Sequence, residues 1–406
     1  MQNRRNTICK ISGKGYTIRN ADKYIRVFPI TFVPVTGNRQ TSCIGTMNKN
    51  RRRMALYIIT GIIIIAGTAV MLFLRQPGFG RLPSGERLER IKQSPHYHDG
   101  AFRNLQPTEL MTSEKGRLRV MWDFLFNKPE GIYPDNPVPA IKTDLRELPA
   151  NSDWMVWFGH SSYLLQLSGK RILVDPVFCT AAPVSFINKP FKGTDLYKPE
   201  DMPGIDLLII THDHWDHLDY QTVKRLKGRI GKVICPLGVG EHFESWGFGK
   251  EDITELDWQE NTITSEGLTV HCLPARHFSG RGVTSNQTLW ASFLLETLSG
   301  NIYLGGDGGY DKHFLKIGED YPRIDLAILE NGQYSENWKH IHTMPQELGS
   351  VAKDLKAKRV ITVHHSKYAL SKHPWDEPLK NESEAAARDS LNLIVPVIGQ
   401  VIELDF

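Results

Sequence analysis

The feature that most constrains this chain is a group of metal-binding side-chain types directly after a buried strand. Residues 205–210 are almost entirely apolar, and residues 211–217 then contain three histidines and two aspartates. A strand that ends in imidazoles and carboxylates presents them at a sheet edge, where irregular backbone lets several side chains converge on one point. A solvated polar loop is the alternative, but it does not require ligand-type side chains at this density. The segment therefore predicts a metal site.

The spacing within this segment favours two metal ions over one. His212 and His214 are two residues apart, so in extended backbone their side chains project to the same side and can bind one ion. Asp216 and His217 follow as the chain turns, and these adjacent residues suit a second ion close by. Imidazole and carboxylate ligands without thiolates favour zinc, with iron or manganese as alternatives. We therefore expect two Zn²⁺ ions per chain.

The motif His212-x-His214-x-Asp216-His217 resembles the signature of the metallo-β-lactamase superfamily of metallohydrolases. The resemblance implies further ligands at the ends of later strands, and three strand-like segments do end in suitable side chains. A pair of metal ions lowers the pKa of a bound water and stabilises the attacking and leaving oxygens of a phosphoryl or acyl displacement. By this resemblance the first ion is held by His212, His214 and His277, the second by Asp216, His217 and His364, and Asp307 bridges both.

Two of these expectations involve a choice between alternatives. Only one of His364 and His365 can point inwards, because successive side chains of a strand point to opposite faces. We choose His364, which aligns with the single histidine of the resembling family's Ile-His-Trp-Gly-Thr-Phe-type segment. Asp175 ends the strand expected at 171–176, and the resemblance implies that it orients a ligand imidazole. A plain strand-terminating aspartate is the alternative there.

A narrower resemblance within the superfamily is carried by residues 157–162, 174–178, 273–281 and 364–370. These segments resemble the branch that includes N-acyl-phosphatidylethanolamine-hydrolysing phospholipase D and bacterial L-ascorbate-6-phosphate lactonases, and the phospholipase is the more similar of the two. His342 matches that family's substrate-contacting histidine, and a solvated residue before a helix is the alternative. Arg281 is expected to contact phosphate as well, because guanidinium groups pair with phosphate oxygens. At residues 365–367 the sequence His-Ser-Lys replaces the family's Trp-Gly-Thr.

The rest of the pattern and the resemblance predict an α/β fold, the αββα metallo-β-lactamase sandwich, in which two sheets pack face to face with helices outside. Hairpins are expected over residues 157–176 and 292–304, each with a short polar turn. Thr343-x-x-Gln346 matches a capping box. The helix that it would open carries its inward-facing side chains at Leu348, Val351, Ala352 and Leu355.

The N-terminal part of the chain predicts a membrane anchor. Residues 1–53 carry a charge of +11, so with a net charge of +4 the remainder is acidic, which argues against a nucleic-acid-binding face. Residues 54–74 are uncharged and long enough to cross a hydrocarbon core of about 30 Å. A cleaved signal peptide is the alternative, but no small-x-small cleavage site follows. The positive charge before the span predicts a cytoplasmic N-terminus and an exported, periplasmic catalytic domain.

The expected organisation has four parts. Residues 1–53 form a basic, unstructured tail, of which 1–46 precede the expected start codon at Met47 and contain at most a short strand at 30–35. Residues 54–74 are the transmembrane anchor. Residues 76–151 are an N-terminal extension with short helices at 86–92 and 113–126, and residues 152–406 are the hydrolase domain.

The sequence therefore predicts a membrane-anchored dizinc phosphodiesterase that acts on a phospholipid. Its catalytic residues are expected to be Asp216, Asp307 and His342. A zinc lactonase is the rival enzyme, and a non-catalytic, membrane-bound metal-binding scaffold is the alternative from another class. The intact set of ligands argues against the scaffold, which would not need every one of them. The oligomeric state stays open.

Overall fold

The computed structural model describes residues 16–20, 23–27, 49–264 and 267–406, which divide into two units at residue 68. In the first unit, β1 (Tyr16–Asn20) pairs antiparallel with β2 (Lys23–Val27). These strands and the start of α1 fall within the range expected to be an unstructured tail. The other residues of that range, including the strand expected at 30–35, lie outside the described residues.

Helix α1 (Lys49–Leu74) contains the whole of the predicted span and begins five residues earlier, in the basic segment before it. An 18-residue window of this 26-residue helix has a mean hydropathy of 2.4, and no residue of the helix is buried. Within the described ranges it is the one helix that is long and apolar enough to cross a membrane. At about 1.5 Å per residue, its length exceeds the thickness of a hydrocarbon core.

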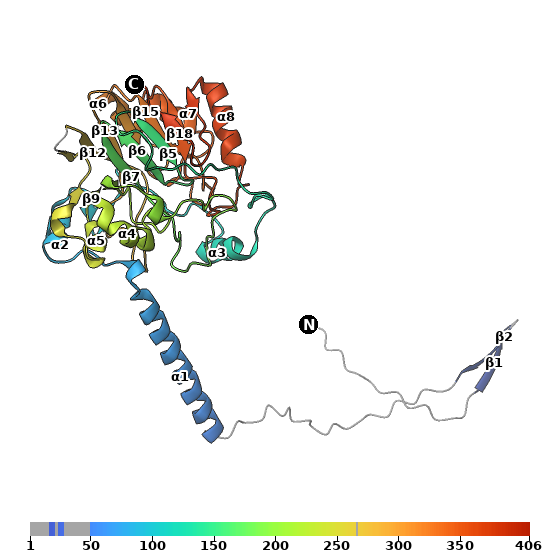
Figure 1. Ribbon diagram of the computed structural model, residues 1–406. Helices are drawn as coiled ribbons and strands as arrows, with labels where there is room; N and C mark the ends of the chain where they lie inside the picture. The colour runs from blue at the N-terminus through green and yellow to red at the C-terminus, as the bar shows by residue number, and fades with distance from the viewer. Residues whose placement is uncertain (1–15, 21–22, 28–48, 265–266) are drawn as a thin grey trace. The chain divides into compact units, whose positions relative to one another are not determined.

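The second unit, residues 69–406, contains two mixed sheets that each have seven strands in its described part (Figure 1). The first sheet has the spatial order β10 (Ile253–Leu256), β9 (Ile230–Pro236), β8 (Ile205–Ile209), β7 (Lys170–Val174), β6 (Tyr163–Leu167), β5 (Trp154–Trp157) and β18 (Val401–Glu403). The second has the order β11 (Asn261–Ile263), β12 (Thr269–Leu273), β13 (Ser292–Glu296), β14 (Asn301–Leu304), β15 (Leu326–Glu330), β16 (Val360–Val363) and β17 (Leu393–Ile394).

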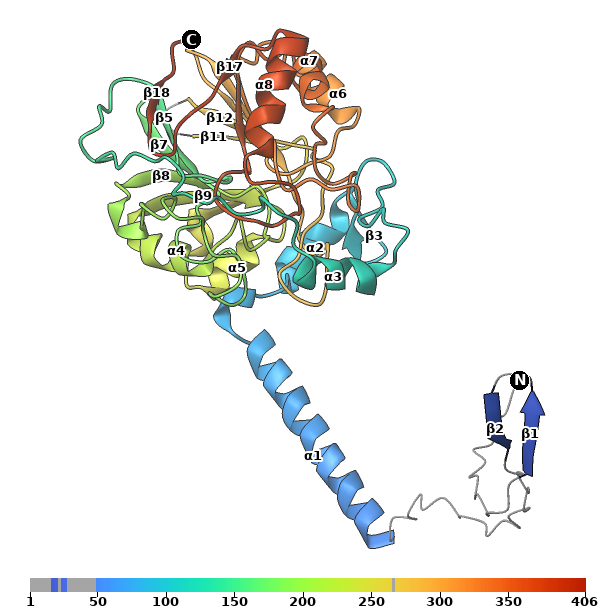
Figure 2. The ribbon, with the colours of Figure 1, turned by 90° about the vertical axis from the view of Figure 1, so that its right-hand side faces the viewer.

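The two sheets pack face to face with helices on their outer faces, as predicted. One buried apolar cluster lies between the sheets, a second lies under α4 and α5, and a third lies under the helices of the C-terminal third. Figure 2 shows α6, α7 and α8 on one side of the strands and α4 and α5 on the other. These helices are α4 (Tyr220–Leu226), α5 (Gly240–Ser245), α6 (His313–Asp320), α7 (Leu348–Asp354) and α8 (Glu377–Asp389).

The direction of the central strands decides where the loops meet. Strands β7, β8 and β9 run parallel, as do β14, β15, β16 and β17, so within each set the carboxyl ends lie at one edge. Both faces of these strands are covered, and their sequences are accordingly near-continuous apolar runs. Polar residues that follow them are therefore brought together in space.

The predicted hairpin over 157–176 exists only in part. Ser168 and Gly169 connect β6 to β7 with φ angles of 50° and 79°, as a tight hairpin turn requires. Residues 158–162 are not strand, however. The backbone N–H of Phe158 donates to the carbonyl of Ser162 at 2.9 Å, which closes a tight loop between β5 and β6. The second predicted hairpin is present as β13 and β14.

The capping box predicted at residues 343–346 is wrong. The Thr343 hydroxyl donates instead to the carbonyl of Gly308 at 2.9 Å, and α7 begins at Leu348. The predicted inward face of that helix is correct, since Leu348, Val351, Ala352 and Leu355 are all at most 2% exposed.

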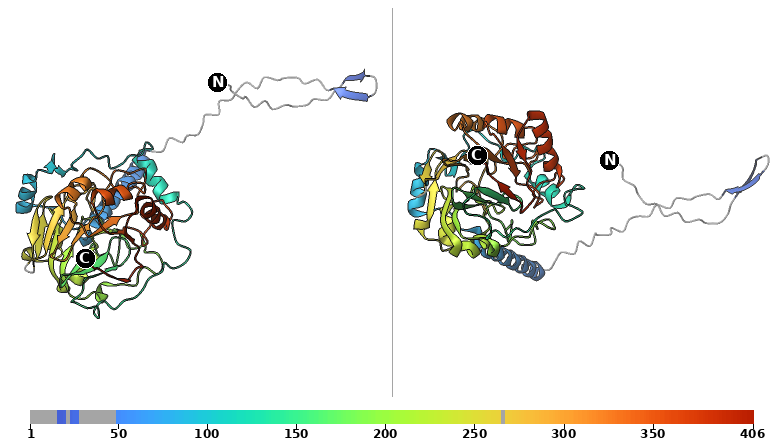
Figure 3. Two further views of the ribbon diagram at one scale, coloured as in Figure 1. Left: turned by 90° about the horizontal axis from the view of Figure 1, so that it is seen from above. Right: turned by 45° about the horizontal axis from the view of Figure 1, so that its top comes forward.

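The N-terminal extension packs onto the hydrolase fold. Arg87 in α2 lies 2.6 Å from the carboxylates of Glu241, which belongs to α5, and Glu255. Elements distant in sequence therefore lie side by side, as the blue and yellow helices do in Figures 1 and 3. The predicted helices are present, and the second begins four residues later than expected. The extension contains α2 (Gly85–Gln93), β3 (Tyr97–His98), β4 (Ala101–Phe102) and α3 (Arg117–Phe126). The short 3-10 helices in the described part of the second unit are η1 (Pro77–Phe79), η2 (Pro199–Asp201), η3 (Lys227–Arg229) and η4 (Lys250–Asp252).

Candidate functional site

The seven predicted metal-binding side chains lie together, and both sheets contribute to the group. Each of them follows the carboxyl end of a strand, where the regular backbone stops and side chains are free to converge. His212, His214, Asp216 and His217 follow β8, His277 follows β12, Asp307 follows β14 and His364 follows β16.

Three of the histidines form a first group. The Nε2 atom of His212 lies 2.9 Å from Nδ1 of His214, and Nε2 of His277 lies 3.2 Å from the same Nδ1 atom. Nitrogens bound to one tetrahedral zinc ion at about 2.0–2.1 Å are about 3.3 Å apart. The first group therefore has the spacing of three ligands around a single ion.

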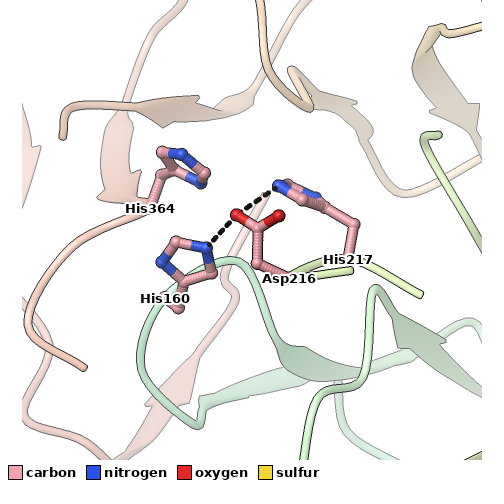
Figure 4. Close-up of side chains that lie close together, drawn as sticks. All are labelled: His160, Asp216, His217 and His364. Atoms are coloured by element: carbon pink, nitrogen blue, oxygen red, sulfur yellow. Dashed lines mark hydrogen bonds and ion pairs between the residues drawn. The ribbon is translucent and has the colours of Figure 1, made fainter. Parts of the chain in front are cut away.

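Asp216, His217 and His364 form a second group, which His160 joins (Figure 4). One ligand-type atom from each of the four lies within 4.8 Å of the others. Asp216 Oδ2 is 3.7 Å from His217 Nε2 and 2.9 Å from His160 Nε2. These two groups of ligand-type atoms, each of the right size for one ion, match the spacing argument from the sequence. Asp307 forms two further clusters that overlap with them, one with His212 and His217 and one with Glu330, His342 and His364.

Asp307 lies between the two groups. Its Oδ2 atom is 3.7 Å from His277 Nε2 and 3.1 Å from His217 Nε2, and its Oδ1 atom is 3.2 Å from His364 Nδ1. Burial raises the pKa of Asp307, but the charge of His217 lowers it more, so the pKa lies well below its usual range. An ionised carboxylate that reaches members of both groups is suited to bridge two cations.

The protonation states of three histidines and two unpaired atoms also fit metal binding. Burial lowers the pKa of His212, His277 and His364 well below the ordinary value, which favours the neutral ring that a metal ligand must have. The pKa of His217 is raised instead, because the charges of Asp307 and Asp216 outweigh the effect of its burial. In the described part of the chain, His217 Nε2 and Asp307 Oδ1 are buried without a hydrogen-bond partner. Such atoms are costly unless something satisfies them. This set of nitrogen and oxygen donors suits zinc, iron or manganese.

Asp175 makes the contact that the resemblance implied. Its Oδ2 atom accepts a hydrogen bond from His217 Nδ1 at 2.8 Å, and the same carboxylate accepts bonds from the backbone N–H and hydroxyl of Thr211. Because Nδ1 is thus occupied, His217 directs Nε2 towards Asp307. Asp175 therefore fixes the orientation of a ring in the second group.

His160 is a member of the site to which the sequence interpretation assigned no role. Its side chain is completely buried, its φ angle is 54°, and its carbonyl accepts a 3.0 Å hydrogen bond from the backbone N–H of His364. Nε2 contacts Asp216. A lone histidine in a hairpin loop is weak evidence for a metal site. Its position next to Gly159, at the sheet edge where the predicted ligands lie, could nevertheless have identified His160 as a member of the site.

His342 lies beside the ligand groups, on a buried carboxylate that the sequence interpretation also missed. Its Nδ1 donates to Glu330 Oε2 at 2.7 Å, and its ring centre is 5.1 Å from that of His277. Glu330 Oε1 accepts from the backbone N–H of Gly308 at 3.0 Å and of Thr343 at 2.7 Å. Burial raises the pKa of Glu330 to about 7, and Glu330 in turn raises the pKa of His342 against the effect of its own burial. The pair therefore keeps a proton between them and leaves Nε2 of His342 for other contacts.

A cavity of about 260 Å³ opens over the two groups. His214, Asp216, His277, Asp307, His342 and His364 contribute to its polar wall. The remaining wall is mainly apolar, and the N-terminal extension contributes two of its side chains. These apolar residues are Leu110, Met111, Phe278, Trp338, Ile341 and Leu370.

Arg281 is not among the residues that line this cavity, contrary to the role predicted for it. Its guanidinium group is buried and donates to the backbone carbonyls of Gly78, Asp213 and Leu218 at 2.7–3.0 Å. It also lies 4.1 Å from the ring centre of Trp215. Since these partners occupy its donors, Arg281 is not available to a phosphate in the cavity.

His364 and His365 point to different surroundings. His364 Nδ1 lies 2.8 Å from the hydroxyl of Ser161 and close to Asp307. His365 instead contacts Thr362 Oγ1 at 3.0 Å through Nε2 and Ser366 Oγ at 2.8 Å through Nδ1. The side chain in the ligand group is thus the one chosen from the sequence.

Comparison with known proteins identifies a matching family model and several similar proteins. A family model described as the beta-lactamase superfamily domain matches residues 170–365. An uncharacterised protein of Mycobacterium tuberculosis is 37% identical over 321 residues, which cover 77% of this chain and 85% of the relative. The range that the family model matches includes all seven predicted ligands, which are the six side chains assigned to the two ions and Asp307.

Two further comparisons bear on activity and fold. N-acyl-phosphatidylethanolamine-hydrolysing phospholipase D 1 of Caenorhabditis elegans is 33% identical over 231 residues, which cover 53% of this chain and 64% of the nematode protein. The structure of isothiocyanate hydrolase from Delia radicum gut bacteria aligns with a TM-score of 0.50 at 16% identity, over 62% of this chain and all of that one. The second likeness concerns the fold alone.

Proposed function

Because the chain belongs to the metallo-β-lactamase superfamily of metal-dependent hydrolases, we propose that it is a membrane-anchored phosphodiesterase of the phospholipase D type. Its substrates would be N-acyl-phosphatidylethanolamine-like lipids, and it would act through two metal ions, preferably zinc. The similarity to the nematode phospholipase supports this substrate class.

The observation that carries the proposal is the two-sided wall of the cavity. Ligand-type histidines and aspartates form one part of the wall, and six apolar side chains together with Gln333 form the rest. A small, highly charged sugar phosphate would leave the apolar wall in contact with water. A phosphodiester with a hydrocarbon chain would cover that wall and still present its phosphate to the metal ligands.

The proposed roles follow from the geometry of the two groups. When bound, two ions would lower the pKa of a water molecule and stabilise the attacking and leaving oxygens of the displacement. His342, held at Nδ1 by Glu330, would direct Nε2 to a phosphate oxygen or to the leaving oxygen. We assign His212, His214 and His277 to the first ion, Asp216, His217 and His364 to the second, and Asp307 to both.

We further propose that α1 crosses a membrane once, with the N-terminus in the cytoplasm and the hydrolase unit on the exported side. The apolar character of α1 and the three arginines at its start, Arg51 to Arg53, support this orientation. A catalytic site beside a bilayer would receive lipid substrates directly.

A lactonase would use the same ligand groups to attack a carbonyl carbon, and it is the second enzyme to test. In the proposed experiment, purified full-length protein in detergent micelles is incubated separately with an N-acylated phosphatidylethanolamine, a bis-aryl phosphodiester and an acyl lactone. We expect the lipid to be cleaved to phosphatidate and an N-acylethanolamine, and His342→Ala to retain metal but to lose most of this turnover. Turnover of the lactone alone would refute the phosphodiesterase proposal. Binding of metal without turnover of any of the three would favour the scaffold.

A further inference from the structure

We propose that residues 77–81, the segment directly after α1, are a structural component of the metal centre. Arg281 connects this segment to the loop that carries four of the ligands. In this view Arg281 is a positioning residue, which joins residues 77–81 to both ends of the loop at 212–218 and so holds the ligands of that loop in place. The inference rests on the proposed metal centre.

The contacts of the Arg281 guanidinium are the first observation. Nη1 donates to the carbonyls of Asp213 and Leu218, both at 2.7 Å. Nε and Nη2 donate to the carbonyl of Gly78 at 3.0 Å and 2.8 Å. Asp213 lies between two predicted ligands and Leu218 follows the last one, so a single buried group spans the whole ligand loop and reaches the segment after α1.

Trp215, in the middle of the same loop, is the second point of attachment. The indole lies under the Arg281 guanidinium and donates from Nε1 to the Arg281 carbonyl at 3.2 Å. Its ring packs edge-on against Phe79 at a centroid distance of 5.1 Å, and Phe79 packs in the same way against Phe73 in the last turn of α1 at 5.2 Å. A Cβ atom at Gly78 would lie 3.2 Å from the indole, so this approach is close.

The Asp213 side chain provides a third connection to the same segment. Its carboxylate accepts hydrogen bonds from the backbone N–H of Gly280 at 2.7 Å and from His242 Nε2 at 3.1 Å. Nδ1 of His242 accepts from the backbone N–H of Arg81 at 3.1 Å. A Cβ atom at Gly80, where φ is 68°, would overlap with the His242 ring, so the backbone fits there only without a side chain.

These contacts matter because the ligand loop has no regular structure of its own. Residues 211–219 are neither helix nor strand, so their conformation depends on contacts from outside the loop. Groups that orient metal ligands from behind typically change metal affinity by about 10- to 100-fold when they are removed. A lysine could not replace Arg281, because one ammonium group cannot span three carbonyls in a planar fork. The segment next to the anchor therefore acts on metal affinity through the loop.

The test uses full-length protein in detergent and measures Zn²⁺ affinity by chelator competition and the visible absorption of the Co²⁺-substituted protein. We expect Arg281→Lys to weaken Zn²⁺ binding about 10- to 100-fold and to change the Co²⁺ spectrum. Arg87→Lys is the matched control, since the Arg87 side chain is only 10% exposed and also has three partners, all of them glutamates outside the loop. It should lower the unfolding midpoint and leave Zn²⁺ affinity and the Co²⁺ spectrum unchanged.

Phe79→Ala provides a second variant on the other side of the contact, in case Arg281→Lys does not fold. It should also weaken Zn²⁺ binding and alter the Co²⁺ spectrum, although to a smaller extent. Wild-type affinity and spectra in both variants would overturn the inference while leaving the metal centre intact. A wild-type protein that binds no Zn²⁺ or Co²⁺ would instead overturn the proposed metal centre, and with it this inference.

Discussion

At the scale of single residues, Asp307 is the side chain on which the two ligand groups depend most. It is almost completely buried, and its two oxygens face histidines of both groups. Without the carboxylate, several histidines would surround two cations with less negative charge to offset them. The site at this position therefore has little tolerance for a neutral side chain.

Asp307→Ala is expected to release at least one metal ion per chain and to lower turnover by roughly 100-fold or more, because one carboxylate serves both ions. Elemental analysis and initial rates measure the two effects. Asp311→Ala, which changes a nearby aspartate outside the ligand groups, is the control and should retain both ions. An Asp307→Ala protein with full metal content would contradict the bridging role.

The neighbouring histidines at 364 and 365 offer a matched pair. His364→Ala should lower metal content and abolish turnover, because His364 faces Asp307. His365→Ala should keep both ions, because the His365 ring contacts Thr362 and Ser366 instead. Metal content of the two purified variants decides the matter, and the reverse pattern would refute the assignment.

Side-chain type, position at a strand end and the resemblance to the superfamily together predicted which residues gather at the site. They were not sufficient to predict what each side chain contacts. Arg281 has the chemistry of a phosphate ligand, but backbone carbonyls of the ligand loop and of Gly78 occupy it. His160 and Glu330 were missed because each is a single polar residue whose role depends on elements far away in sequence.

At the scale of secondary-structure elements, the layering of the fold was predicted by the alternation of apolar runs and amphipathic helices together with the resemblance to the superfamily. The local details that failed involved tertiary hydrogen bonds. Thr343 matched a capping box, yet its hydroxyl bonds to the carbonyl of Gly308, and the loop at 158–162 replaced the expected strand. Local patterns cannot reveal such partners.

The packing of α8 on β16 gives a prediction about stability. Glu382 of α8 is buried, and Thr362 of β16 donates a hydrogen bond to it. Burial raises the pKa of Glu382 to about 7, although hydrogen bonds from Thr362 and Asn331 oppose this. Between about pH 4.5 and 7 the folded protein therefore binds more protons than the unfolded chain, so this group's contribution to stability falls as the pH rises.

Glu382→Gln should remove this pH-dependent contribution. As the pH rises from about 4.5 to 7, the free energy of unfolding of the variant should therefore increase by up to about 3 kcal/mol relative to that of wild type. Denaturant unfolding at several pH values, at equal metal load, measures the difference between the two proteins. Glu384→Gln, at an exposed position of the same helix, should follow wild type. A constant difference between Glu382→Gln and wild type across this range would contradict the prediction.

At the scale of the whole molecule, the proposed orientation of α1 decides which substrates can reach the site. Alkaline phosphatase fused behind residue 406 should be active, because it would be exported together with the hydrolase unit. A fluorescent protein that matures in the cytoplasm, fused at the same point, should stay dark. An inactive phosphatase with a bright fluorescent fusion would refute both the orientation and the argument for lipid access from the exported side.

The central claim, that the cluster at the strand ends is a two-metal catalytic centre, is tested most directly by returning metal to chelated enzyme. Full-length protein is stripped of metal, Zn²⁺ is added in known equivalents, and bound metal and phosphodiester turnover are measured in each sample. The account predicts no turnover in the stripped protein and a rise in activity that stops at two bound ions per chain. Turnover in the stripped protein, or saturation of activity at a single ion, would contradict it.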